Sequence, residues 1–228
     1  IVNGLKELHI DMAQVEGIFI SHEHSDHIAG LQQLLKRFDI PVYTKQGTWR
    51  EIQDKLVVPK NQLIELTKGS LTLGNLIVEP FAVSHDAADP IGINVFSGND
   101  KATVVTDTGI ISDDILHRLD DSTLLVLEAN YDPHMLRFGP YQPFLKQRVA
   151  SDEGHLSNEM AAQALLMMKR PDFMQVILAH RSENNNNAVL VTQTIGKMLV
   201  DGGVRIGPEM KLQHGQPNEI VSMQSIKR

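Results

Sequence analysis

The sequence predicts a layered α/β sandwich. Short apolar runs rich in β-branched residues recur along the chain, and amphipathic helical patterns lie between them. The 228 residues are 42% hydrophobic and 21% charged, ordinary proportions for a chain that buries one sizeable core. No linker, low-complexity tract or repeat interrupts it, so we expect a single domain over residues 1–228.

The strands and helices follow from these runs in order. Apolar stretches predict strands at 18–20, 41–43, 76–78, 91–96, 102–105, 124–127 and 176–178. Helical spacing of apolar residues predicts helices at 28–38, 49–56, 111–119, 157–169 and 188–200. Strands grouped in twos and threes and then covered by helices favour a layered sandwich over a strict βαβ alternation.

Composition removes several classes of function. The chain has no cysteine, which excludes disulfides, thiolate nucleophiles and iron–sulfur clusters and leaves nitrogen and oxygen ligands for any metal. No apolar run approaches the ~20 residues of a membrane span, and the first residues do not form a signal peptide, so we expect a soluble, cytoplasmic protein without a membrane partner. The net charge of −7 argues against a wholly basic nucleic-acid-coating surface but permits a local basic strip.

The segment Ser-His-Glu-His-Ser-Asp-His at residues 21–27 is the most informative part of the chain. It follows an apolar strand and precedes an amphipathic helix. His22 and His24 would point to the same side of an extended backbone, whereas on a helix they would diverge by about 200°. Asp26 and His27 fall at the turn into the helix. Carboxylates and imidazoles packed so closely favour a cation, and two neighbouring ions are plausible here.

Three further candidates stand at strand ends. His85, Asp107 and His180 each follow an apolar run directly. Buried strands that end in such residues deliver them to one rim of a sheet, where an open cleft can form. Taken singly, each is more often an ordinary hydrogen-bonded residue than a metal ligand.

Together, the pattern H-x-H-x-D-H followed by His, Asp and His resembles the metallo-β-lactamase superfamily over nearly the whole chain. The resemblance implies a four-layer αββα sandwich with two divalent metal ions, zinc or manganese. It also implies that this chain lacks the family's N-terminal strands and is truncated relative to the family. By the same resemblance, the metal ligands are His22, His24, Asp26, His27, His85, Asp107 and His180.

The ligand roles are also implied by the resemblance. His22, His24 and His85 would hold the first ion, Asp26, His27 and His180 the second, and Asp107 would bridge them. A hydroxide between the ions would be the nucleophile. Within this resemblance, the absence of cysteine and the aspartate at position 26 fit the broad hydrolase branch better than the antibiotic-hydrolysing members, which use a cysteine ligand, and so argue against β-lactams as substrates.

Two segments resemble the phosphodiesterase branch typified by tRNA 3′-processing ribonucleases. They are Leu-Glu-Ala-Asn at 127–130 and Gly-His-Leu-Ser at 154–157. In that branch such a pair places a proton donor at the leaving oxygen, so His155 would be the general acid and Glu128 its orienting partner. Glu128 and His155, with Asp26, are the candidate catalytic residues. The alternative is that Glu128 only pairs with a surface base and that His155 only begins a helix. Without the resemblance, this alternative and the catalytic role have about even odds.

The long connection between residues 130 and 153 mixes basic and aromatic side chains. Arg137, Tyr141, Lys146 and Arg148 suit phosphate contacts and base stacking, and we predict that they bind substrate. The alternative is an ordered cover with buried aromatics. Its motifs resemble the YycJ/WalJ (VicX) group of this superfamily, which implies a metal-dependent DNA exonuclease.

The sequence therefore predicts a dinuclear phosphodiesterase acting on nucleic acid, with DNA favoured over RNA. Two alternatives remain open: a thioester or lactone hydrolase on the same metals, and a non-catalytic, metal-stabilised regulator of a cell-wall signalling system. The metal used, the polarity of cleavage and the formation of a homo-oligomer are left open by the sequence.

Overall fold

The structure, a computed structural model, describes residues 1–67, 69–217 and 219–221. The chain divides into two compact units. The first unit comprises Ile1–Ala82 and Ala87–Ile93, and the second comprises Val83–Asp86 and Asn94–Arg228. The single-domain organisation stays a prediction.

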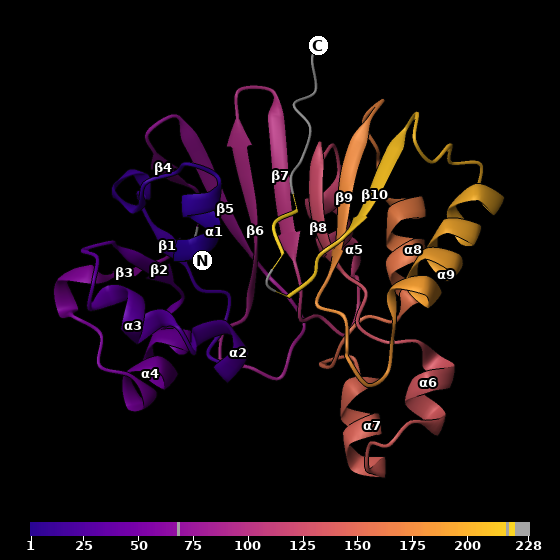
Figure 1. The fold of residues 1–228 in the computed structure, drawn as a ribbon, viewed down its shortest axis with the longest axis horizontal. Helices are drawn as coiled ribbons and strands as arrows, with labels where there is room; N and C mark the ends of the chain where they lie inside the picture. The colour runs from indigo at the N-terminus through magenta and orange to yellow at the C-terminus, as the bar shows by residue number, and fades with distance from the viewer. Residues whose placement is uncertain (68, 218, 222–228) are drawn as a thin grey trace. The chain divides into compact units, whose positions relative to one another are not determined.

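The first unit contains short helices and two small groups of strands (Figure 1). Its elements are α1 (Val2–Glu7), η1 (Met12–Gln14), β1 (Ile18–Phe19), α2 (Ser25–Ile28), α3 (Leu31–Leu35), β2 (Val42–Thr44), α4 (Gln46–Lys55), η2 (Lys60–Gln62), β3 (Leu63–Glu65), β4 (Leu71–Leu73) and β5 (Leu76–Ala82). Strands β1, β2 and β3 form a parallel sheet in that order. Strands β4 and β5 form an antiparallel hairpin, and Gly74 provides the positive φ that its turn needs.

The core of the first unit positions the turn that follows β1. Ile20 and Ile28, on either side of this turn, are both buried in one apolar cluster with Val42 and Ile52. Burial of these side chains holds both ends of the segment 21–27, so its polar residues occupy a loop between two fixed points.

The second unit alternates strands with helices. Its elements are the end of β6 (Ile91–Ser97), then β7 (Asp100–Val105), α5 (Asp113–Leu119), β8 (Leu124–Glu128), α6 (Pro133–Phe138), α7 (Pro143–Val149), α8 (Asn158–Met167), β9 (Met174–Ala179), α9 (Ala188–Asp201) and β10 (Met210–His214). Strands β7, β8, β9 and β10 are parallel and adjacent in that order. Because right-handed crossovers in one direction place their helices on the same face, α8 and α9 lie side by side against these strands (Figure 1).

The strand register aligns the chemically important strand ends. Val105 of β7 pairs with Leu127, and Glu128 pairs with Ala179. Asp107 and His180 lie one or two residues beyond these pairs. Three candidate residues from sequence-distant segments therefore meet at the carboxyl edge of one parallel sheet.

Most predicted elements are present, with shifted ends. The predicted helix at 28–38 is instead two short helices, α2 and α3, separated by Ala29 and Gly30. The connection at 130–153 contains two helices that the sequence did not predict, α6 and α7, both of which begin at a proline. Among the described residues, no helix is long and apolar enough to span a bilayer.

Candidate functional site

The first unit brings His22, His24 and His27 together after β1. Nε2 of His22 lies 3.1 Å from Nδ1 of His24, and the Ser21 hydroxyl lies 3.1 Å from Nδ1 of His22 and 3.0 Å from Nδ1 of His27. His22 is only 1% exposed. His24 is the N-cap of α2, in extended backbone, which gives the loop geometry that the spacing predicted.

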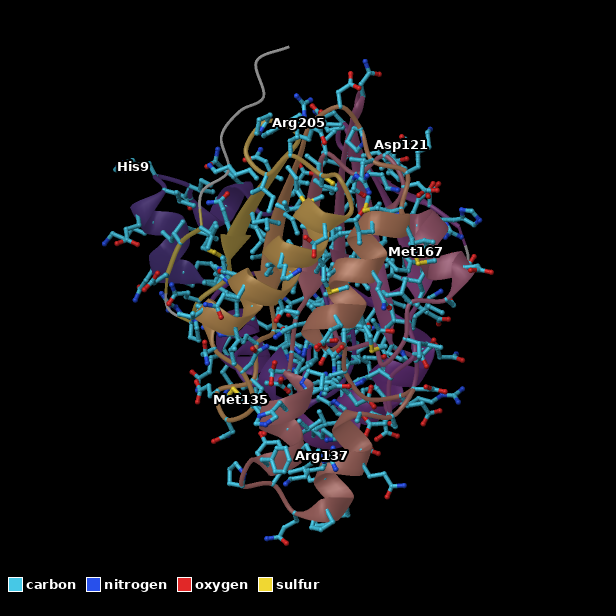
Figure 2. All side chains as sticks on the ribbon, turned by 90° about the vertical axis from the view of Figure 1, so that its right-hand side faces the viewer. His9, Asp121, Met135, Arg137, Met167 and Arg205 are labelled. Atoms are coloured by element: carbon cyan, nitrogen blue, oxygen red, sulfur yellow. The ribbon has the colours of Figure 1, made fainter. Side chains whose placement is uncertain are left out.

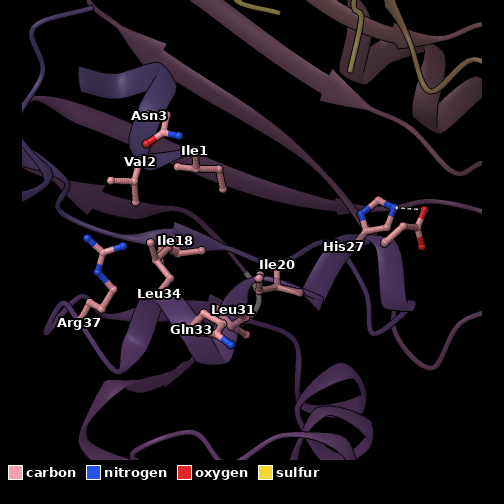
Figure 3. Close-up of a pocket in the computed structure, with 12 residues that line it drawn as sticks. Ile1, Val2, Asn3, Ile18, Ile20, His27, Leu31, Gln33, Leu34 and Arg37 are labelled. Carbon is pink, nitrogen blue, oxygen red and sulfur yellow. Dashed lines mark ion pairs between the residues drawn. The ribbon is translucent and has the colours of Figure 1, made fainter. Parts of the chain in front are cut away.

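Asp26 lies in the first turn of α2 with His27, and its Oδ2 is 3.6 Å from Nε2 of His27. Figure 3 shows this pair beside a cavity of about 490 Å³ in the first unit. Apolar side chains such as Ile18, Ile20 and Leu34 line much of the cavity. Polar side chains, among them Gln33 and Arg37, line the rest of the cavity.

In the second unit, Asp107 and His180 stand at strand ends in unusual backbone conformations. Their φ angles are 57° and 51°, in the left-handed region that non-glycine residues avoid. Asp107 is 2% exposed, and its Oδ1 lies 3.4 Å from Nε2 of His180. Such conformations cost of order 1–3 kcal/mol each and cluster at functional sites.

Glu128 is the centre of the second unit's cluster. Its carboxylate is completely buried, and its Oε1 lies 2.8 Å from Nδ1 of His155 and 2.7 Å from Nδ1 of His180. The backbone N–H groups of Thr108 and Leu156 donate to Oε2, each at 3.2 Å. Burial alone would raise the pKa of Glu128, but the hydrogen bonds from the two histidines hold its pKa below the ordinary value. The carboxylate is therefore ionised near neutral pH.

This ionised carboxylate determines the tautomer of both histidines. A carboxylate can only accept, so Nδ1 of His155 and Nδ1 of His180 each carry the hydrogen. In the neutral rings the lone pair is then on Nε2. The sequence predicted the pairing with His155 and did not predict the pairing with His180, which lies 52 residues from Glu128.

His85 is oriented in the same way by a backbone carbonyl. Its Nδ1 donates to the Gly154 carbonyl at 3.1 Å, so its Nε2 carries the lone pair. That Nε2 is buried and lies 3.8 Å from Oδ1 of Asp107. Burial is the main reason why the pKa of His85 is lowered, which keeps the ring neutral and able to act as a ligand.

The donor atoms of the second unit fit a divalent cation. Ligand atoms of Asp107, Glu128, His155 and His180 all lie within 4.8 Å of one another. Glu128 already accepts four hydrogen bonds, so we regard it as the partner of ligands and not as a ligand itself. The Nε2 lone pairs of His85 and His180 face the Asp107 carboxylate. These electron-rich atoms repel one another unless a cation or a proton lies between them.

The predicted ligands thus form two groups. His22, His24, Asp26 and His27 gather in the first unit, and His85, Asp107 and His180 gather in the second with Glu128 and His155. That all seven serve one two-ion centre stays a prediction.

Buried asparagines join the segments that carry the second group. The side chains of Asn158 and Asn186 form a reciprocal amide pair at 3.1 and 2.8 Å. Nδ2 of Asn186 also donates to the carbonyls of Ala129 and Asn130, just after Glu128, at 3.0 and 3.1 Å. The amide of Asn130 in turn donates to the His180 carbonyl at 2.8 Å. Asn186 belongs to a run of four asparagines at 184–187, and no sequence motif predicted this network.

We expect Asn186→Ala to lower the free energy of unfolding by about 2–4 kcal/mol, because it leaves buried carbonyls and the Asn158 amide without their donor and acceptor. Urea unfolding followed by circular dichroism measures this. Asn184→Ala, an exposed neighbour in the same run, is the matched control and should change the midpoint little. Equal midpoints for the two variants would contradict the role given to Asn186.

The four predicted substrate-binding residues lie on or between α6 and α7. Arg148 donates to both oxygens of Asp86, one of them at 2.9 Å, which raises the pKa of Arg148. Nζ of Lys146 donates to the Arg137 carbonyl at 2.8 Å. Tyr141 packs against the buried side chains that hold the two helices together. Figure 2 shows Arg137 on α6, below the α8 and α9 layer.

Comparisons with known proteins support the family resemblance of the sequence motifs. The model of the beta-lactamase superfamily domain matches residues 4–180. The exodeoxyribonuclease YycJ of Bacillus anthracis is 34% identical over 223 residues, which are 97% of this chain and 84% of that protein. Among solved structures, the metallo-beta-lactamase fold protein YhfI from Bacillus subtilis superposes with a TM-score of 0.63 at 15% identity, covering 88% of this chain and 75% of that chain.

The short form of human tRNase Z superposes with a TM-score of 0.55 at 21% identity, covering 78% of this chain and 77% of that chain. At these identities the two solved structures establish the fold alone. The predicted α/β class and the fold implied by the resemblance are confirmed.

Proposed function

The chain belongs to the β-lactamase superfamily and is a metal-dependent hydrolase, and from this premise we propose that it is a dinuclear phosphodiesterase that degrades DNA as an exonuclease. The 34% identity to an exodeoxyribonuclease over 97% of the chain supports DNA as the substrate. The contact that carries the phosphodiesterase proposal is the 2.8 Å hydrogen bond between Glu128 and His155, beside the Asp107 carboxylate.

The proposed ligands are His22, His24 and His85 for one ion, Asp26, His27 and His180 for the other, and Asp107 for both. Divalent ions bound there, zinc or manganese, would supply Lewis-acid catalysis and lower the pKa of the attacking water. All seven donors are nitrogen or oxygen atoms, which suit either metal. Asp26 would bind the second ion through its carboxylate, which lies in the first turn of α2.

His155 is the proposed general acid. Its Nδ1 hydrogen is fixed by Glu128, so Nε2 is the atom that can carry a second proton to a departing sugar oxygen. The side chain is 14% exposed, which leaves it accessible to a substrate. A thioester expels a thiolate, a good leaving group that needs no such proton donor, so the buried Glu128 partner favours the phosphodiester over a thioester.

Residues on the helices after Glu128 are proposed to contact the nucleic acid. Arg137 and Tyr141 are candidates, although the Tyr141 hydroxyl accepts a hydrogen bond from Asn184 at 3.5 Å, while Lys146 and Arg148 would act close to their partners Arg137 and Asp86. A cytoplasmic location and a homo-oligomeric state belong to this proposal as expectations from the sequence.

The proposal is tested by incubating protein loaded with zinc or manganese with end-labelled single- and double-stranded DNA and RNA. The product ladder reports the polymer, the direction of cleavage and the metal at once. A parallel assay compares bis-p-nitrophenyl phosphate with a thioester, using wild-type protein and His155→Ala. Absence of phosphodiester hydrolysis, together with thioester hydrolysis that survives His155→Ala, would overturn the proposal.

A further inference from the structure

The exposed aromatic side chains of the described residues are concentrated on one small structure. The α6–α7 hairpin, residues 133–149, carries Phe138 and Phe144, which are 67% and 72% exposed. The other large hydrophobic side chains exposed in the described part of the chain are aliphatic or methionine. Leaving a phenylalanine in water forgoes about 1.5–3 kcal/mol of burial, so two on one hairpin indicate a partner.

The interior of the hairpin does not need these rings. Leu136 and Val149 are buried between the helices with Tyr131, and Tyr141 and Leu145 pack against them. Because this cluster already holds α6 and α7 together, Phe138 and Phe144 can be replaced without leaving a cavity between the two helices.

Charge on the hairpin indicates the chemistry of the partner. Residues 133–150 contain three basic side chains and no acidic one, in a chain whose net charge is −7. The Arg137 guanidinium lies 5.3 Å from the centroid of the Phe138 ring, and the His134 ring centroid lies 4.6 Å from it. Planar groups and cations gathered at an exposed surface suit a polyanion that also carries flat rings.

The hairpin begins and ends at the candidate catalytic residues. α6 starts five residues after Glu128, and the carbonyl of Val149 at the end of α7 accepts the backbone N–H of His155 at 2.9 Å. Arg148 anchors the same end to Asp86, next to His85. A strand bound along the hairpin would therefore run from the exposed rings toward His155.

We propose that the α6–α7 hairpin binds single-stranded nucleic acid, with unpaired bases stacked on Phe138 and Phe144 and the backbone held by Arg137. This rests on the proposed nuclease function and adds to it the strand state of the substrate. Bases in a duplex are stacked on one another, so only unpaired bases can lie on these rings.

Binding is measured without turnover, by fluorescence anisotropy of a labelled oligodeoxynucleotide in the presence of a chelator. Three probes of equal length are used: a single strand, its duplex, and an abasic strand with the same phosphates. Stacking on one aromatic ring is worth about 1–3 kcal/mol, so Phe138→Ala and Phe144→Ala should each raise Kd for the single strand about ten-fold. The double variant should raise this Kd about a hundred-fold. Phe144→Trp, which keeps an aromatic ring, should bind the single strand as the wild type does.

Two controls separate stacking from other causes. Met167→Ala removes a side chain on α8 that is also 67% exposed and should leave Kd unchanged. The abasic strand should bind more weakly than the single strand, and its Kd should not respond to the phenylalanine variants.

Unchanged single-strand Kd in the double phenylalanine variant would overturn the proposal, as would a change from dimer to monomer in light scattering with binding intact, because the rings would then cover a second copy of the chain. The proposed function is tested separately. If single-strand binding depends on both rings but metal-loaded protein cleaves no nucleic acid, the nuclease proposal is contradicted and the binding proposal is supported.

Discussion

Glu128→Gln is expected to lower kcat for DNA hydrolysis about 10³-fold while the chain stays folded. The carboxylate accepts four hydrogen bonds and holds His155 and His180 in the tautomers that leave Nε2 available. A glutamine has nearly the same shape, but its NH₂ group cannot accept, so one pair of donors loses its partner and the rings are no longer held. Steady-state kinetics on a labelled oligonucleotide measures the effect, and circular dichroism confirms folding.

Glu183→Gln is the matched control. It makes the same substitution at an exposed position in the loop after β9, and wild-type kinetics are expected. A Glu128→Gln enzyme that keeps the wild-type kcat would show that the carboxylate has no part in the reaction.

His155→Ala separates the general acid from its partner. A dinucleotide needs a proton on the departing sugar oxygen, whereas p-nitrophenolate departs without one. The variant should therefore lose about 10²–10⁴-fold on DNA and much less on bis-p-nitrophenyl phosphate. Equal losses on the two substrates would contradict the role of proton donor.

Asp107→Asn should abolish both activity and the stabilisation by metal. This carboxylate is 2% exposed and faces the Nε2 atoms of His85 and His180, so it supplies negative charge beside these two imidazoles. At a metal concentration of 100 times Kd, binding to the folded state is worth about 2.7 kcal/mol. For a chain of this size that raises Tm by about 5–10 °C, and the variant should lose most of this rise.

Scanning calorimetry with and without zinc or manganese measures the shift, and elemental analysis counts the ions retained. Asp113→Asn, at an exposed position in the first turn of α5, is the control and should keep the full rise in Tm. Retention of two ions by Asp107→Asn, with an undiminished rise in Tm, would exclude the bridging role.

Local spacing was enough to locate the strands and the chemically important residues. An apolar run followed by histidine or aspartate is a feature of a few consecutive residues, and β1, β7 and β9 appear where such runs predicted them. The helix after His27 was predicted as one piece, because the periodicity of its leucines continues across Gly30 while the backbone does not. The two helices in the connection after Glu128 were not predicted, since helices of six and seven residues are too short to show a clear period.

The motifs by themselves determined the family, the metal ligands to propose and the pairing of Glu128 with His155. Only the tertiary structure decided which donors share an acceptor. His180 reaches Glu128 across 52 residues, and Asn186 reaches the carbonyl of Ala129 across 57. Contacts of this kind depend on the register of parallel strands, which places the ends of β8 and β9 side by side. This register cannot be derived from the spacing of residues along the chain.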